Sequence, residues 1–168
     1  MSVMKIQKKE LMRVSIAKRD PDFLKTLERM YHDSKILFEQ GQYYNSCYLS
    51  GYVLECALKF LLCCYGRKSN GDHYTWRDAK RHSHKLNELN QELEECLAIT
   101  DGIPPQYRLD SSRMCPYIFS GREGYSHWDP AFRYGECPAW DTKEYCEHYI
   151  EESEKIFRFV SGIIAGGV

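Results

Sequence analysis

The stretch that most constrains this chain is GYVLECALKFLLCCYG at residues 51–66. Apolar side chains occur on every face of it, and Gly66 ends the run. This pattern predicts a buried helix from about Tyr43 to Tyr65, the least accessible helix of the fold, with one face made of Cys47, Gly51, Leu54, Leu58, Leu61 and Leu62. Gly51 inside that helix costs roughly 1 kcal/mol relative to Ala, which a close approach of another helix would explain. Such a helix needs neighbours on several sides, so the stretch favours a bundle.

A charge pair interrupts this apolar stretch. Glu55 precedes Lys59 by four residues, the favourable order on a helix, which contributes about 0.2–0.5 kcal/mol when the pair is exposed. In a core the same pair is not stabilising by default, because both ions lose their hydration. Two interpretations stay open. Glu55 has a structural role, tying helices together by hydrogen bonds, or the pair belongs to a functional site.

Three more helices are predicted from apolar residues that recur every three to four positions: 21–40, 84–98 and 141–164. Their expected starts are residues that cap helices: Asp20 before Pro21, Ser83, and Asp141 with Glu144 three residues later. No alternating pattern indicates a strand. The sequence therefore predicts an all-α, up-and-down bundle of four main helices. We expect a single domain over residues 1–168 with its core at about 20–164.

Two connecting segments are predicted to be irregular. Residues 66–80 form a polar loop. Residues 100–140 hold five of the six prolines and many aromatic residues; we expect this long insertion to pack onto the bundle, and long connections often carry function. Its aromatic side chains could stack on bases or form a satellite core beneath the loop: Tyr125, Trp128, Phe132, Tyr134 and Trp140.

Charge and cysteine usage narrow the function classes. The net charge of −1 gives no global attraction to nucleic acid or to a membrane. The chain shows no uninterrupted apolar run of about 18 residues and no signal-peptide core, so we expect a cytoplasmic protein without membrane association. The eight cysteines form no CxxC pair, which favours reduced thiols used in packing and predicts no metal. No cofactor motif is present, so no cofactor is expected.

Two segments resemble the HEPN family (higher eukaryotes and prokaryotes nucleotide-binding domain). They are DSKILFEQGQYYNSCYLSGYVLECALKFLL at 33–62 and HSHKLNEL at 82–89, followed by a tyrosine-rich last helix. The family's E-x-A-L-K core matches Glu55, Ala57, Leu58 and Lys59. Its H-D-L signature matches His84 and Leu86, with Lys85 in place of the acidic residue. The resemblance covers about residues 20–164, although the 100–140 insertion is long for the family.

This resemblance implies a helical module that binds a nucleotide, RNA or a partner protein such as a nucleotidyltransferase, in a toxin–antitoxin or defence-type system. It also implies a homodimer. A third class of function, a protein-interaction scaffold using residues 100–140, stays open.

An alternative implied by the same family is a metal-independent endoribonuclease. Such enzymes use an Arg followed four to six residues later by a His at a dimer interface. Two pairs with four intervening residues are the catalytic candidates: Arg77 with His82, and Arg122 with His127. Histidine can move a proton near neutral pH, and an arginine fork can hold phosphate oxygens. The competing interpretation is that these histidines are caps or surface residues.

The basic segment KRHSHK at 80–85 is a candidate phosphate-binding site. Lys80, Arg81, His84 and Lys85 precede a predicted helix, and backbone N–H groups gather at a helix N-terminus. The alternative is a solvated basic turn.

Overall fold

The computed structural model describes residues 22–99, 108–122 and 127–165. In these ranges the helices are α2 (Phe23–Glu39), α3 (Tyr43–Tyr65), α4 (Trp76–Lys80), α5 (Leu86–Ile99), α6 (Ser111–Met114), α7 (Pro116–Ser120) and α8 (Lys143–Ile164), with 3-10 turns η2 (Pro130–Arg133) and η3 (Pro138–Asp141). No β-strand occurs among them; the one isolated bridge pairs Arg67 with His73. The predicted all-α class with four long helices is confirmed.

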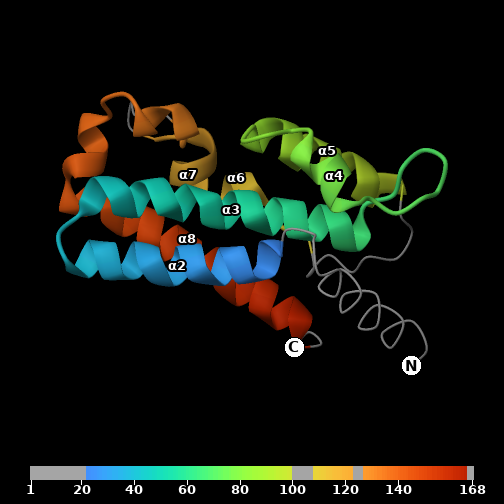
Figure 1. The fold of residues 1–168 in the computed structure, drawn as a ribbon, viewed down its shortest axis with the longest axis horizontal. Coiled ribbons are helices and arrows are strands. Elements are labelled where there is room, and N and C mark those ends of the chain that lie inside the picture. Colours follow the sequence, from blue (N-terminus) through green and yellow to red (C-terminus); the bar gives the residue numbers. More distant parts are fainter. Residues whose placement is uncertain (1–21, 100–107, 123–126, 166–168) are drawn as a thin grey trace.

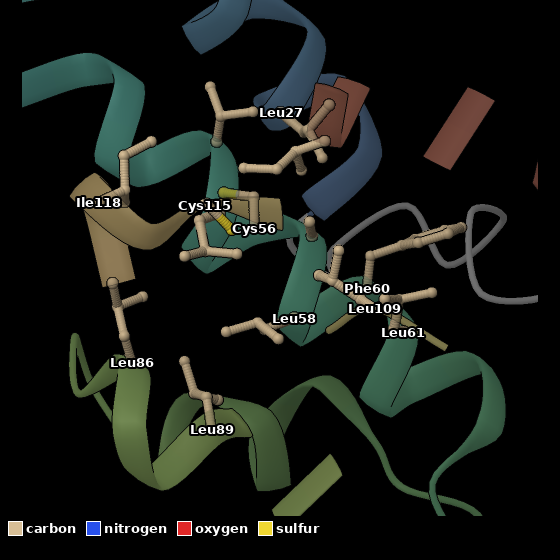
Figure 2. Close-up of a cluster of buried hydrophobic side chains, with 14 of the residues drawn as sticks. Leu27, Cys56, Leu58, Phe60, Leu61, Leu86, Leu89, Leu109, Cys115 and Ile118 are labelled. Carbon is tan, nitrogen blue, oxygen red and sulfur yellow. The ribbon is translucent and has the colours of Figure 1, made fainter. Parts of the chain in front are cut away.

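Helix α3 is the central element of the bundle. Figure 1 shows α2 running back along α3, α8 passing behind the pair, and α5 lying over the C-terminal half of α3, with α7 also in contact with α3. Every residue from Val53 to Tyr65 is buried. In Figure 2, Leu58 of α3 and Leu89 of α5 share one apolar cluster with Leu27 of α2 and Ile118 of α7. The predicted burial of this helix is therefore confirmed for its second half.

Helix α3 is also long and apolar enough to cross a membrane by length and composition alone. Most of its apolar stretch is buried inside the bundle, as expected of the core helix of a globular fold. All eight cysteines are buried. Burial raises the pKa of the Cys56 thiol to about 12, which keeps it neutral and suited to packing.

The helix starts differ from prediction by one or two residues. Helix α2 begins after Asp22, whose carboxylate accepts a hydrogen bond from the backbone N–H of Lys25 at 3.0 Å; Asp20 lies outside the described residues. Helix α8 is capped by the Thr142 hydroxyl rather than by Asp141. In each case the capping oxygen accepts a first-turn N–H, which satisfies one of the four orphan donors of a helix start.

The predicted loop at 66–80 contains a short helix. Helix α4 is held by a capping box in which the Thr75 hydroxyl accepts from the Asp78 N–H and the Asp78 carboxylate accepts from the Thr75 N–H. Helix α5 begins at Leu86 rather than at residue 84. The chain turns just before it, with Ser83 in the left-handed region at φ 49°, so Ser83 is not the expected cap.

The 100–140 insertion is less irregular than predicted. Its described parts form α6, α7, η2 and η3, because Asp110 and Asp129 cap two of these turns and Pro begins three of them. The expectation that the insertion packs onto the bundle is confirmed: Leu109, Cys115, Ile118, Trp128 and Trp140 are buried.

Gly51 marks a close approach, although not the helix–helix contact expected from sequence. A Cβ at this position would overlap the indole ring of Trp128, which reaches α3 from the insertion. The indole N–H donates to the Tyr48 carbonyl at 3.0 Å, and the Trp128 backbone N–H donates to the Ile118 carbonyl at 2.9 Å. Because Gly51 has no side chain, the Trp128 ring can pack directly against the backbone of α3.

A buried carboxylate anchors α7 to α8. Glu152 is almost fully buried, and its two oxygens accept the backbone N–H groups of Tyr117 and Ile118, each at 2.9 Å. Burial raises the pKa of Glu152 to about 7, although these two hydrogen bonds act in the opposite direction. The attachment of this part of the insertion thus depends on a side chain that titrates near neutral pH.

We predict that Gly51→Ala destabilises the protein by about 1–3 kcal/mol, because the new methyl group must displace the Trp128 ring. Gly162→Ala is the matched control: Gly162 also lies in a long helix, and nothing lies within 4 Å of a Cβ there. That variant should gain up to about 1 kcal/mol from helix propensity. Urea unfolding measures the stability of both variants. Equal changes in the free energy of unfolding would contradict the packing of Trp128 against Gly51.

We also predict a pH dependence of stability that Glu152 controls. Because its folded pKa is raised from 4.5 to about 7, its favourable contribution is complete below pH 4.5 and is lost as the pH rises through 7. Relative to Glu152→Gln, the wild type should lose about 2–3 kcal/mol between pH 5 and pH 8.

Urea unfolding at the two pH values measures this difference. Glu147→Gln, at an exposed position on the same helix, is the control and should follow the wild type. A Glu152→Gln variant with the wild-type pH dependence would contradict the assignment.

Candidate functional site

An open cleft of about 550 Å³ lies between α2 and α3. The residues that line it are Met30 and Leu37 from α2, Tyr44, Asn45, Tyr48, Leu49 and Tyr52 from α3, and Arg133 from η2. The three tyrosines are four residues apart, so they share one face of α3 and rise about 12 Å along its axis. We call these three residues the tyrosine row.

The insertion positions Arg133 beside the middle of the tyrosine row. The Tyr44 hydroxyl lies 2.6 Å from the Phe132 carbonyl and 3.0 Å from the Gly135 carbonyl, on either side of Arg133. The Arg133 guanidinium lies 6.0 Å from the centre of the Tyr48 ring. No carboxylate of the described residues forms an ion pair with Arg133, so its five N–H donors are available to an anion.

At one end of the row, Tyr52 adjoins His84. The Tyr48 and Tyr52 hydroxyls are 3.0 Å apart, and the Tyr52 and His84 rings meet edge-on with centroids 5.6 Å apart. Burial raises the pKa of Tyr52, helped by its hydrogen bond with Tyr48. The raised pKa keeps the Tyr52 hydroxyl protonated, beside the apolar faces of the tyrosine rings.

His84 is held by the charge pair of the core. Lys59 Nζ lies 2.6 Å from Glu55 Oε1, and His84 Nδ1 lies 2.8 Å from Glu55 Oε2. The side chains of Glu55 and Lys59 are only 4% and 8% exposed, whereas that of His84 is 45% exposed. An ionised carboxylate only accepts hydrogen bonds, so Nδ1 is the donor and the second ring nitrogen is left for solvent or a ligand.

This arrangement is compatible with both a structural role and a functional-site role for Glu55. Glu55 links α3 to the turn that precedes α5, which is a structural task. It also hydrogen-bonds one ring nitrogen of the exposed His84 beside the cleft, which fixes the orientation of the imidazole ring.

The predicted pair Arg77 and His82 is not at this cleft. Arg77 is exposed, with its guanidinium 5.4 Å from the centre of the Trp76 ring. His82 lies between two carboxylates, with Nδ1 3.6 Å from Glu88 and Nε2 3.3 Å from Glu92. In this arrangement both nitrogens of His82 face acidic side chains of α5.

The second predicted pair is also away from the cleft lining. Arg122 and His127 are both exposed, and residues 123–126 between them lie outside the described residues. The positive charge of Arg122 acts on Glu152, where it opposes the rise in pKa.

Two cations of the basic segment 80–85 lie next to carboxylates. Lys80 is exposed, Arg81 lies 3.6 Å from Asp78, and Lys85 lies 2.7 Å from Glu88. Hydrogen bonds from Thr75 lower the pKa of Asp78 to about 2 despite its desolvation, so it stays ionised. Of the four candidate phosphate-binding residues, His84 is the one that contacts a cleft residue.

Sequence reasoning missed Arg133 and the tyrosine row as site residues. The i, i+4, i+8 spacing of the tyrosines was a readable signal. Arg133 gave none, because only the folding of the insertion brings it to α3. Among the aromatic residues proposed from sequence, Trp128 and Trp140 are buried, whereas Tyr134 is 87% exposed; Tyr125 lies outside the described residues.

Metal-ligating side chains do not cluster in the described ranges: no group of three or more His, Cys, Asp or Glu gathers there in a way that could hold an ion. The residues that line the cleft offer aromatic stacking and, at Arg133, anion binding, and His84 adjoins the lining at Tyr52.

We predict that Glu55→Gln costs about 3–5 kcal/mol, because Lys59 keeps its charge in the core without an ionised partner. The double variant Glu55→Leu with Lys59→Met should recover much of this loss, since it removes both buried charges. Glu154→Gln breaks the exposed pair with Arg158 at the same spacing and should have little effect. Urea unfolding tests the set; a double variant no better than Glu55→Gln would contradict the argument.

Comparisons with known proteins assign the chain to a family. Searches of curated proteins and of solved structures give no match. The family model described as the HEPN domain matches residues 21–163. This span contains α2, α3, α5 and all but the last residue of α8, together with the cleft and the Glu55–Lys59–His84 network. The chain belongs to the HEPN domain family.

Proposed function

We propose that this HEPN module binds a nucleotide in the cleft between α2 and α3, with the phosphate on Arg133 and the base against the tyrosine row. The family supports a helical module related to nucleotides and RNA. The observation that supports this site is the position of Arg133 over the ring of Tyr48: it is an exposed arginine that pairs with no carboxylate of the residues that the structure describes.

Physical chemistry favours this ligand over others. Every base has a π-face that can stack on tyrosine, and such stacking contributes about 1–3 kcal/mol per base. A guanidinium matches phosphate geometry with two parallel N–H donors. The walls from Met30 and Leu37 are apolar, and a flat base covers apolar surface well, whereas a purely anionic ligand would leave them in water.

The wider setting comes from the family alone and forms part of the proposal. It comprises a cytoplasmic homodimer that works with a partner such as a nucleotidyltransferase in a toxin–antitoxin or defence-type system. Endoribonuclease activity through an Arg–His pair stays a prediction, and the positions of Arg77, His82, Arg122 and His127 add no support to it.

We predict that Arg133→Ala weakens binding of adenosine 5′-monophosphate by about 10- to 100-fold, the effect of losing a charge-assisted hydrogen bond. Isothermal titration calorimetry in EDTA measures the affinity without metal. Arg158→Ala is the matched control, since Arg158 is exposed on α8 and is not part of the cleft. Nucleotide binding that survives Arg133→Ala unchanged would contradict the proposed site.

A further inference from the structure

The insertion is fastened to both α8 and α3. On α8, the buried carboxylate of Glu152 accepts two backbone N–H groups in the first turn of α7, each at 2.9 Å. On α3, the Trp128 ring packs against Gly51, and its indole N–H donates to a carbonyl of the same helix at 3.0 Å. We call residues 115–122 and 127–133, which carry these two contacts, the strap.

A hydrogen bond within the strap couples these two contacts. The Trp128 backbone N–H donates to the Ile118 carbonyl at 2.9 Å, and the N–H of Ile118 is one of the two groups that Glu152 accepts. Asp129 then caps η2, the turn that carries Arg133, by accepting a backbone N–H of that turn at 2.7 Å. A displacement of α7 is therefore transmitted to the residues that hold Trp128 against α3 and Arg133 beside the cleft.

Glu152 is the group in these contacts whose charge changes near neutral pH. Burial raises its pKa to about 7, against the two backbone hydrogen bonds and against the positive charges of Lys155 on α8 and Arg122 after α7. Tyr145 of α8 and Cys115 at the start of α7 also interact with Glu152, but burial raises the pKa of each of them, so both stay neutral. The charge state of this contact is therefore set by Glu152 itself.

We infer that Glu152 is a pH-sensitive latch that holds the strap on the bundle. When Glu152 is neutral, the strap stays in place. When Glu152 is ionised, lifting α7 away lets water stabilise its charge, so the strap is released more easily. Release uncovers Cys115, which is fully buried in the apolar cluster of Figure 2, and takes Trp128 off α3. The latch is a property of the free protein and does not depend on the proposed ligand.

Rising pH favours release, because the attached strap binds the proton of Glu152 more tightly than the released strap does. In the released state Glu152 is in water, with its ordinary pKa of 4.5, against about 7 in the attached state. The population of the released strap should therefore rise about tenfold from pH 6 to pH 8.

Labelling of the full chain with N-ethylmaleimide at pH 6 and pH 8, located by peptide mass spectrometry, tests the latch. Each rate is divided by that of the urea-unfolded chain at the same pH, which removes the pH dependence of the thiol chemistry. The normalised rate at Cys115 should rise about tenfold in the wild type and stay constant in Glu152→Gln, which cannot ionise. Glu147→Gln, at an exposed position on the same helix, should follow the wild type.

Two further comparisons separate release of the strap from unfolding of the bundle. Cys47 lies against Cys146 between α3 and α8, so at pH 8 it should be labelled at least about tenfold more slowly than Cys115. Gly51→Ala, which displaces the Trp128 ring, should speed labelling of Cys115 about five- to tenfold if the two contacts are coupled. Gly162→Ala should leave that rate unchanged.

Three results would overturn the latch. The first is a normalised rate at Cys115 that is the same at pH 6 and pH 8, or that rises equally in Glu152→Gln. The second is labelling of Cys115 no faster than that of Cys47, because the strap would then leave only when the bundle unfolds. The third is an unchanged rate at Cys115 in Gly51→Ala, because α7 and Trp128 would then be released separately.

Discussion

Burial of α3 on nearly all sides is the constraint on which the rest of the structure depends. From Val53 to Tyr65 every side chain is covered, and α2, α5 and α8 are the long helices that cover it. The insertion completes the enclosure through Trp128, which occupies the space that Gly51 leaves open. Only the first half of α3 keeps an accessible face, and the tyrosine row occupies it. The position of the cleft is thus a consequence of how the core is closed.

The charge pair inside α3 connects this core to the surface. Burying Glu55 and Lys59 is costly, and a buried ion pair is weak evidence for stability. Here Glu55 uses its second oxygen to hold His84, so the pair fixes a side chain that an apolar helix could not orient. A charge pair in the middle of an apolar helix is understandable if its task is positioning. Glu152 has a similar positioning role, because its buried carboxylate accepts two backbone N–H groups in the first turn of α7.

The sequence was informative where local rules decide. The long apolar helix, its end at Gly66 and the four-helix class follow from periodicity and capping, and the family resemblance rests on Glu55, Lys59 and His84. Helix starts shifted because neighbouring Asp, Ser and Thr residues compete as caps. The path of the insertion and the position of Arg133 could not be predicted, since no local sequence pattern indicates which distant helix a proline-rich segment will cover. The contact between Trp128 and Gly51 could not be predicted for the same reason: the sequence shows the glycine, but the residue that packs against it is 77 positions away.

The central claim is the proposal that the accessible face of α3 binds a nucleotide, and ultraviolet crosslinking of bound adenosine 5′-monophosphate followed by peptide mass spectrometry tests it most directly. The account predicts crosslinks on the α3 peptide that contains Tyr48 and Tyr52, and weaker crosslinking when Arg133→Ala lowers the affinity. Crosslinks confined to Arg77–His82 or to the segment around His127, with none on α3, would contradict it.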